Sequence, residues 1–224
     1  KKILPKFGIH VASFNVGQTH DEIINIVNES GYASKLAMVY IETPANPTLA
    51  CIDIEALARV TSLHNRYSAI DNTFATPYLQ QPLLLGVDFV IHSTTKFING
   101  HGNSIAGVVI GKDAELFKQT IWNTMKLTGA NCSPFEAWLV YQGMKTLPLR
   151  MDKHSSNALL ISTTLSNHPN VSRVNYPGLE SHPDHFVAKK QMRAFGGMMS
   201  FELNGGIDTA IKAMNKLRFC SLAP

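Results

Sequence analysis

The segment FVIHSTTKFINGHG, residues 89–102, decides how the fold of this chain is interpreted. An apolar run, Phe89 to Ile91, leads directly into a row of polar residues that ends in Lys96, and a glycine-rich turn follows. Several hydroxyl groups and one amine therefore lie at the carboxyl end of a buried strand. This pattern is typical either of a solvated strand end or of a site that binds a phosphate and presents the amine for reaction.

Apolar runs on both sides of this segment predict a sheet. We expect strands at four places, residues 36–43, 67–72, 88–94 and 105–111. Between them, apolar residues at helical spacing behind Asp53 predict a helix over 53–65, and a turn with a brief helix is expected at 76–86. Strands that are apolar on both faces and separated by helices predict an α/β fold, with a mostly parallel sheet and helices on both faces.

The second half of the chain changes to a mainly helical pattern. Helices are predicted at residues 114–126, 133–144, 149–168 and 208–217, and a strand at 198–203. We expect a larger domain over residues 1–147 and part of a smaller α+β domain over 148–224. Neither end resembles a natural terminus, so we expect this chain to be an internal portion of a longer protein, with both domains incomplete.

Composition and charge exclude several classes of protein. The 224 residues are 45% hydrophobic and 16% charged, which is typical of a globular protein. The net charge of +4 is scattered, so no nucleic-acid surface is predicted, and no apolar run approaches the roughly 20 residues of a membrane span. The three cysteines are far apart, which predicts neither a zinc site nor a disulfide framework and favours a reducing, cytoplasmic location.

Polar side chains follow three of the predicted strands. Glu42 and Thr43 end the first, with Asn46 just beyond, and Asp71 to Thr73 and His92 to Lys96 end the next two. Because the carboxyl ends of parallel strands lie at one edge of a sheet, where ligands bind, these groups are expected to line one crevice.

This set of groups suits the chemistry of pyridoxal 5′-phosphate (PLP). The amine of Lys96 must be neutral at some stage to form a Schiff base with an aldehyde, and burial favours the neutral amine. A carboxylate at Asp71 would keep a pyridine nitrogen protonated. Ser93 and Thr95 are two residues apart in an extended segment, so both hydroxyls can face a phosphate.

Each of these residues also has an ordinary structural interpretation. An aspartate such as Asp71 at a strand end more often caps a helix, and a Ser-x-Thr-Lys segment is more often a solvated turn. Only the joint pattern favours a cofactor. A nicotinamide dinucleotide is disfavoured, because Ile105 stands where the dinucleotide fingerprint requires glycine. His92 and His101 do not form a convincing metal-binding pattern, so no metal is predicted.

The chain closely resembles the Cys/Met-metabolism (trans-sulfuration) branch of the fold-type I PLP-dependent enzymes. That family includes methionine γ-lyase, cystathionine γ-lyase, cystathionine γ-synthase and the O-acylhomoserine sulfhydrylases. The resemblance runs through nearly the whole chain and is carried by YIETPANPTL (40–49), IDNTFATPYLQQPLLLGVDFVIHSTTKFINGHG (70–102), GMKTLPLRMDKHSSNA (143–158), YPGLESHPDH (176–185) and GGMMSFEL (196–203).

The resemblance implies a role for each matching residue. Lys96 resembles the catalytic lysine that forms the Schiff base and moves protons between substrate carbons, and Asp71 resembles the catalytic partner of the pyridine nitrogen. The cofactor-binding residues that it implies are Lys96, Asp71, Ser93, Thr95, Asn46 and Thr73. Among these, Ser93 and Thr95 would bind the phosphate, Asn46 the phenolic oxygen, and Thr73 would support Asp71.

The resemblance also implies an activity and an assembly. It is closest to methionine γ-lyases and O-acylhomoserine sulfhydrylases, and we expect γ-elimination that releases 2-oxobutanoate, ammonia and a thiol from a sulfur amino acid. The alternatives are γ-replacement, as in cystathionine γ-synthase or a sulfhydrylase, and cystathionine γ-lyase activity. The family forms homotetramers built from two dimers. The family's ring-stacking tyrosine and carboxylate-binding arginine have no counterpart here, so a truncated, non-catalytic chain is the alternative from a different class.

Overall fold

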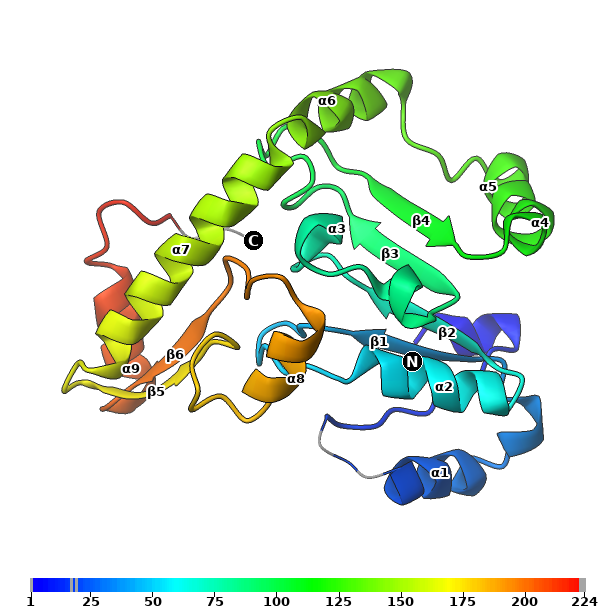
Figure 1. Ribbon diagram of the computed structural model, residues 1–224, viewed down its shortest axis with the longest axis horizontal. Helices are drawn as coiled ribbons and strands as arrows, with labels where there is room; N and C mark the ends of the chain where they lie inside the picture. Colours follow the sequence, from blue (N-terminus) through cyan, green and yellow to red (C-terminus); the bar gives the residue numbers. More distant parts are fainter. Residues whose placement is uncertain (1, 17, 19, 222–224) are drawn as a thin grey trace.

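The computed structural model describes residues 2–16, 18 and 20–221. A four-stranded sheet forms one side of the molecule, and a long helix, α7 (Leu147–Ser166), leads from it to a second, two-stranded sheet (Figure 1). Within the described ranges, no helix is both long enough and apolar enough to cross a membrane.

The four-stranded sheet has the order β1-β2-β3-β4. Its strands are β1 (Met38–Glu42), β2 (Tyr67–Asp71), β3 (Phe89–Ser93) and β4 (Gly107–Gly111). The first three are parallel, as predicted, whereas β4 runs antiparallel to β3 at the edge. The direction of β4 follows from the loop over residues 94–106, which turns back without the crossover helix that a parallel neighbour requires.

One face of this sheet is covered by α2 (Ile54–Leu63), close to the predicted range. Asp53 caps the helix, because its Oδ1 accepts a hydrogen bond of 3.0 Å from the Ala56 backbone N–H. The buried face of the helix packs on buried side chains of the three parallel strands, and this core comprises Ile54, Ala58, Ile41, Ile70 and Val90, together with Val87. Helices α3 (Thr76–Leu79) and η3 (Pro82–Leu85) form the connection to β3.

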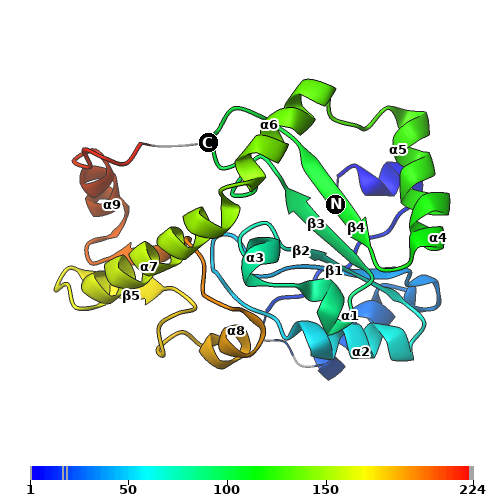
Figure 2. The ribbon, with the colours of Figure 1, turned by 45° about the horizontal axis from the view of Figure 1, so that its top comes forward.

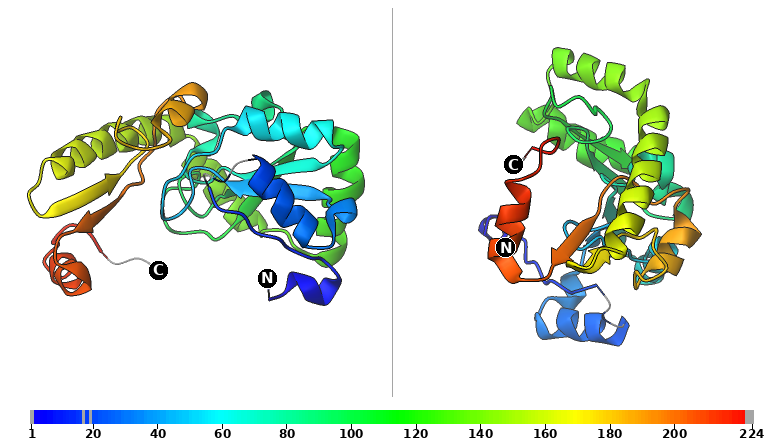
Figure 3. Two further views of the ribbon diagram at one scale, coloured as in Figure 1. Left: turned by 90° about the horizontal axis from the view of Figure 1, so that it is seen from below. Right: turned by 90° about the vertical axis from the view of Figure 1, so that its left-hand side faces the viewer.

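The first part of the chain contains elements that the sequence did not predict. Helix α1 (His20–Glu29) lies on the β1 side of the sheet, as Figures 1 and 3 show, and short 3-10 helices occur at η1 (Leu4–Phe7) and η2 (Ala33–Lys35). Its apolar residues Ile23, Ile26 and Val27 recur at helical spacing and are partly buried, a periodicity from which the helix could have been predicted.

The helical region predicted over 114–126 is observed as three consecutive pieces. They are α4 (Ala114–Phe117), a π-helical turn η4 (Lys118–Trp122) and α5 (Asn123–Thr128), and they lie beside β4 in the view of Figure 2. Helix α6 (Pro134–Met144) follows, capped by Ser133. Helix α7 then begins at Leu147, two residues before the predicted start.

The second sheet pairs β5 (Val171–Asn175) with β6 (Ser200–Leu203) in antiparallel fashion. Strand β6 was predicted, but β5 and helix α8 (His185–Gln191) were not. Helix α9 (Gly206–Met214) is the last helix among the described residues, and it begins two residues before its predicted start. The left panel of Figure 3 shows this sheet and α9 on the side of the molecule away from β3.

One hydrophobic core contains residues from both sides of the predicted domain boundary near residue 147. Its buried members include Leu79 of α3, Met151 of α7 and Ala188 of α8, together with Ile98 in the turn after β3 and Met192 just beyond α8. The division into domains at 1–147 and 148–224 therefore stays a prediction.

A chain of buried amides reinforces this junction. Gln80 Nε2 donates to the Thr43 carbonyl at 3.0 Å and to Asn72 Oδ1 at 2.8 Å, and Gln80 Oε1 accepts from Gln191 Nε2 at 3.1 Å. The amides connect the residue that follows Asp71 to α8, so the carboxyl end of β2 is tied to the C-terminal part of the chain.

Candidate active site

Asp71 and Ser93, two of the predicted site residues, are joined through a third, Thr73. The Thr73 backbone N–H donates to Asp71 Oδ1 at 2.9 Å, and Thr73 Oγ1 accepts from the Ser93 backbone N–H at 2.8 Å. Asp71 ends β2 and Ser93 ends β3, so the two parallel strands terminate at one edge. This arrangement brings together a carboxylate and a hydroxyl where ligands of α/β sheets bind.

The second oxygen of Asp71 contacts Tyr40, a residue that the sequence analysis did not identify. The Tyr40 phenol donates to Asp71 Oδ2 at 3.4 Å. Burial, and next the negative charge of Asp71, raise the pKa of Tyr40 to about 12. The phenol is therefore protonated at neutral pH and can act as a donor. The alternation of side chains along β1, which places Tyr40 and Glu42 on one face, could have signalled this contact.

Glu42 and Asn46 lie at the end of β1, next to Asp71. Glu42 is the register partner of Asp71, and its Oε1 accepts a hydrogen bond of 3.3 Å from the Asn46 backbone N–H. Burial raises the pKa of Glu42, an effect that the Asn46 hydrogen bond opposes and the charge of Asp71 reinforces. The Asn46 side chain is exposed, so its amide is accessible beside the carboxylates.

Ser93 and Thr95 differ in what their hydroxyl groups contact. Within the part of the chain that the structure describes, Ser93 Oγ has no hydrogen-bond partner and is free to bind a ligand. Thr95 Oγ1 instead donates to the Ala106 carbonyl at 3.2 Å and accepts from the Ala106 backbone N–H at 3.0 Å. Thr95 therefore closes the loop between β3 and β4, and its hydroxyl must change partner before it donates to a phosphate.

Lys96 lies in the turn immediately after Ser93 and Thr95. Its backbone N–H donates to the Ser93 carbonyl at 3.3 Å, and its carbonyl accepts from Gly100 at 2.7 Å. The side chain is exposed. The buried amine expected from the sequence is therefore not found in this chain taken alone.

Buried polar atoms that lack a hydrogen-bond partner are concentrated in the segment that carries Lys96. Among the described residues they are His92 Nδ1, Thr94 Oγ1, Asn99 Oδ1 and Ser104 Oγ. Burial lowers the pKa of His92, whose side chain is 1% exposed. Such groups cost stability and are uncommon in folded proteins, so each of these four atoms calls for a partner beyond the contacts described.

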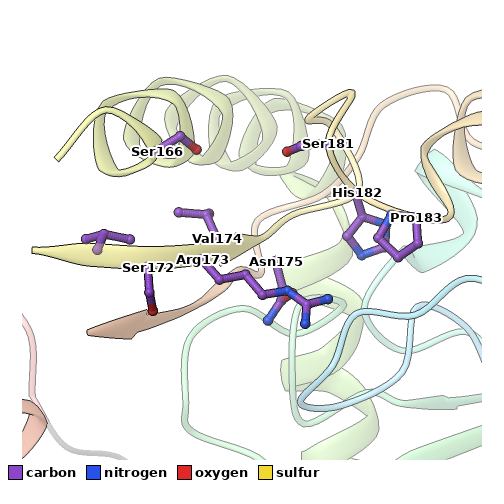
Figure 4. Close-up of a pocket in the computed structure, with 9 residues that line it drawn as sticks. Ser166, Ser172, Arg173, Val174, Asn175, Ser181, His182 and Pro183 are labelled. Atoms are coloured by element: carbon purple, nitrogen blue, oxygen red, sulfur yellow. The ribbon is translucent and has the colours of Figure 1, made fainter. Parts of the chain in front are cut away.

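A cavity of about 240 Å³ lies elsewhere, between the end of α7, strand β5 and residues 181–183 (Figure 4). Ser166 and Ser181 lie on one side of the strand, and the Arg173 side chain extends on the other (Figure 4). None of the predicted site residues lines this cavity, so its position gives no support to the site at the strand ends.

Comparison with known proteins gives consistent matches. The model of the Cys/Met metabolism PLP-dependent enzyme family matches residues 1–224. An L-methionine gamma-lyase of Fusobacterium nucleatum subsp. polymorphum is 46% identical over 222 residues, which cover 98% of this chain and 54% of that protein. A cystathionine beta-lyase of Coxiella burnetii is 41% identical over 211 residues, 94% of this chain and 54% of that protein.

The fold has a similar counterpart among solved structures. A crystal structure of cystathionine gamma synthase from Xanthomonas oryzae pv. oryzae, in complex with aminoacrylate and cysteine, matches with a TM-score of 0.87 and 38% identity over 99% of this chain and 56% of that one. The chain thus spans about half the length of the proteins that it matches. On the family match over its whole length and the identity to these relatives, the chain belongs to the Cys/Met metabolism PLP-dependent enzyme family.

Proposed function

We propose that the intact protein is a PLP-dependent carbon–sulfur lyase of the methionine γ-lyase type. It would convert a sulfur amino acid to 2-oxobutanoate, ammonia and a thiol. The observation that carries the proposal is the linkage of Asp71 to Ser93 through Thr73, because the Ser93 carbonyl accepts the hydrogen bond that begins the turn carrying Lys96. The 46% identity to an L-methionine gamma-lyase supports the choice of reaction.

The residues present fit the cofactor. Each oxygen of Asp71 accepts one hydrogen bond, from Thr73 or Tyr40, and a carboxylate oxygen has a second lone pair that a pyridine N–H can use. The free Ser93 hydroxyl is a donor for a phosphate, whereas Thr95 would have to exchange its bond to Ala106. Asn46 offers an exposed amide for the phenolic oxygen.

When bound, PLP supplies an aldehyde that an amine can bond and a ring that stores the electron pair left by a departing proton. Lys96 Nζ would take the proton from the α-carbon of the substrate and return a proton later in the reaction. Asp71 would keep its negative charge beside the pyridine nitrogen, and Thr73 would hold its Oδ1 in place. The Tyr40 phenol, protonated at neutral pH, would donate to the same carboxylate.

Substitution of Lys96 tests this assignment. In the full-length protein loaded with PLP, Lys96→Ala is expected to lose the visible absorbance of the lysine imine and all turnover of methionine. Lys112→Ala, which changes another exposed lysine just beyond β4, is the matched control and should retain both. An imine band that persists in Lys96→Ala would refute the assignment of this lysine.

The second candidate is γ-replacement, as in a cystathionine γ-synthase or an O-acylhomoserine sulfhydrylase. The likeness to the cystathionine gamma synthase structure favours it, and cystathionine γ-lyase activity is a further alternative within the family. Release of 2-oxobutanoate and thiol from methionine alone supports elimination. A thioether product formed only from an O-acylhomoserine and a thiol would establish replacement instead.

A non-catalytic chain is the alternative outside the enzyme class. Equilibrium dialysis of this 224-residue chain with PLP separates the two. Retention of PLP that depends on Lys96 would reject the non-catalytic alternative for the chain itself. The absence of retention, together with an inactive full-length protein, would establish it.

We also propose a homotetramer of two dimers in the cytoplasm. Exposed aromatic side chains on α6, among them Phe135, Trp138 and Tyr141, provide apolar surface that an interface would cover. Cys51, Cys132 and Cys220 are free thiols, which suits a reducing compartment. Light scattering on the full-length protein measures the mass, and a monomer would contradict the proposed assembly.

A further inference from the structure

Arg150, the fourth residue of α7, contacts the loop that carries Lys96. Its Nη1 donates to the Phe97 carbonyl at 2.6 Å, and its Nη2 donates to the Ile98 carbonyl at 3.2 Å. These carbonyls belong to the two residues that follow Lys96 in the chain. The guanidinium group therefore binds the backbone of the lysine turn directly, from more than fifty positions away in the sequence.

The same guanidinium group is anchored on its own side. Nη2 also donates to the Gly143 carbonyl at 2.8 Å at the end of α6, and Nε donates to Thr146 Oγ1 at 3.0 Å. The planar group thus has two partners on the turn and two at the junction of α6 and α7. Because the guanidinium group is a planar, rigid fork and has partners on both sides, it fixes the distance between the turn and the junction of α6 and α7. A lysine ammonium group cannot reproduce this geometry.

Two glycines make this close approach possible. Gly100, in the turn, has φ of +70°, and a Cβ added there would clash with the Arg150 guanidinium group. Gly143, on α6, lies so close to Asn99 that a Cβ would clash with the Asn99 backbone. The turn is therefore packed directly on Arg150 and on the end of α6.

Among the described residues, Arg150 has no carboxylate partner, since the ion pairs present there join Lys190 to Asp53 and Glu55. Partial burial lowers the pKa of Arg150. Its hydrogen bonds to backbone carbonyls are charge-assisted and roughly twice as strong as neutral ones. All four hydrogen bonds of the guanidinium group therefore go to backbone carbonyls or to the Thr146 hydroxyl. Two of the four go to the turn after Lys96.

We propose that Arg150 is a positioning residue that fixes the turn carrying Lys96, so that the amine is held where the cofactor aldehyde can be reached. The inference rests on the proposed function for the role of Lys96. It assigns Arg150 no contact with substrate or cofactor. Its effect passes through the Phe97 and Ile98 carbonyls to the backbone of the lysine.

Hydrogen exchange of the full-length protein without cofactor tests whether Arg150 fixes the turn. In Arg150→Lys, which keeps the charge but loses the fork, the amides of Asn99 and Gly100 should exchange at least about tenfold faster than in the wild type. These amides donate to the Thr94 and Lys96 carbonyls within the turn. The exchange rate of the Ile70 amide, in the buried strand β2, should be unchanged, since the hydrogen bonds of Arg150 stabilise only the turn. Equal exchange at Gly100 in both proteins, or a rise at Ile70 as large as that at Gly100, would overturn the proposal.

Imine formation with added PLP, followed by its visible absorbance, tests the consequence for Lys96. Arg150→Lys should form the imine about tenfold more slowly and should lower kcat more than it raises KM. Arg193→Lys is the matched control, because Arg193 is an exposed arginine that stacks on Tyr78 and not on the turn. An unchanged rate of imine formation in Arg150→Lys would refute the role.

Failure of the proposed role of Lys96 as the amine that binds PLP would give a different result. The wild-type protein itself would then form no imine with PLP, whereas the exchange of Gly100 would still decide whether Arg150 fixes the turn. Thr146→Val supplies a further comparison, since it removes the acceptor of Nε and the bond from Thr146 Oγ1 to the Gly143 carbonyl but leaves both bonds from Arg150 to the turn. It should leave the exchange of Gly100 near the wild-type rate, and a rate as fast as in Arg150→Lys would contradict the direct action of the fork on the turn.

Discussion

Thr73 Oγ1 accepts a 2.8 Å hydrogen bond from the Ser93 backbone N–H, so a single side chain joins the ends of two neighbouring parallel strands. The Thr73 backbone N–H holds Asp71 at the same time. The carboxylate and the serine hydroxyl are thus placed by one buried residue.

Thr73→Val should weaken cofactor binding. The isosteric change leaves the Ser93 N–H without its acceptor, and an unpaired buried N–H costs about 1–3 kcal/mol. We expect the Kd for PLP of the full-length protein to rise about tenfold, which corresponds to ~1.4 kcal/mol. Thr73→Ser keeps the hydroxyl and should bind nearly as the wild type does. Equal affinity for PLP in Thr73→Val and wild type would show that the bond does not position Ser93.

Gly100→Ala should destabilise the protein more than Gly102→Ala does. Both glycines have positive φ, +70° and +65°, so each substitution costs about 1–2 kcal/mol of backbone strain. At Gly100 the new Cβ also displaces the Arg150 guanidinium group, whereas at Gly102 nothing lies within 4 Å. Urea unfolding measures both variants. A free energy of unfolding that falls equally in the two would contradict the close packing of the turn on Arg150.

Gln80→Leu should lower the free energy of unfolding by about 2–4 kcal/mol, because a buried network loses its central member. Gln80 is 1% exposed, and its removal leaves the Thr43 carbonyl, Asn72 Oδ1 and Gln191 Nε2 without this partner. The neighbouring Gln81 is exposed, so Gln81→Leu should change stability by less than about 0.5 kcal/mol. Thermal unfolding followed by circular dichroism compares them, and a mild effect at Gln80 would mean that the amides are dispensable.

Cys51 should resist thiol reagents at pH 8, whereas Cys132 and Cys220 should react. Burial raises the pKa of the Cys51 thiol from 9.0 to about 12, so almost no thiolate forms there, while the other two thiols are exposed. Mass spectrometry of labelled peptides from native and unfolded protein identifies the modified residues. Rapid labelling of Cys51 in the native protein would show that the β1–α2 connection opens readily.

The same raised pKa predicts a dependence of stability on pH. Above pH 9 the unfolded chain loses the Cys51 proton while the native chain retains it, so the native state binds more protons and loses stability as the pH rises toward 12. Cys51→Ala should therefore show a smaller loss of stability between pH 8 and about 10.5 than the wild type in urea unfolding. An identical loss in the two proteins would exclude a contribution from this thiol.

Local patterns were sufficient to predict much of the fold. The apolar runs that became β1, β2 and β3, and the capped helix behind Asp53, are visible in the sequence because each depends on residues that are neighbours in the chain. The placement of Asp71 and Ser93 at adjacent strand ends follows from the same rule, since parallel strands end at one edge. Strand β5 was missed because it is short and its pairing with β6 joins distant segments, whereas helix α1 has apolar residues at helical spacing and could have been predicted from them.

The sequence by itself determined the type of sheet, the polar groups at its carboxyl edge and the resemblance to a PLP-dependent family. Only the tertiary structure decided that Tyr40 donates to Asp71, that Lys96 is exposed in this chain, that β4 is antiparallel and that Arg150 binds the lysine turn. The physical reason is distance along the chain. A strand or a cap depends on residues a few positions apart, whereas a contact between residues 97 and 150 exists only once the backbone has brought α7 against the turn.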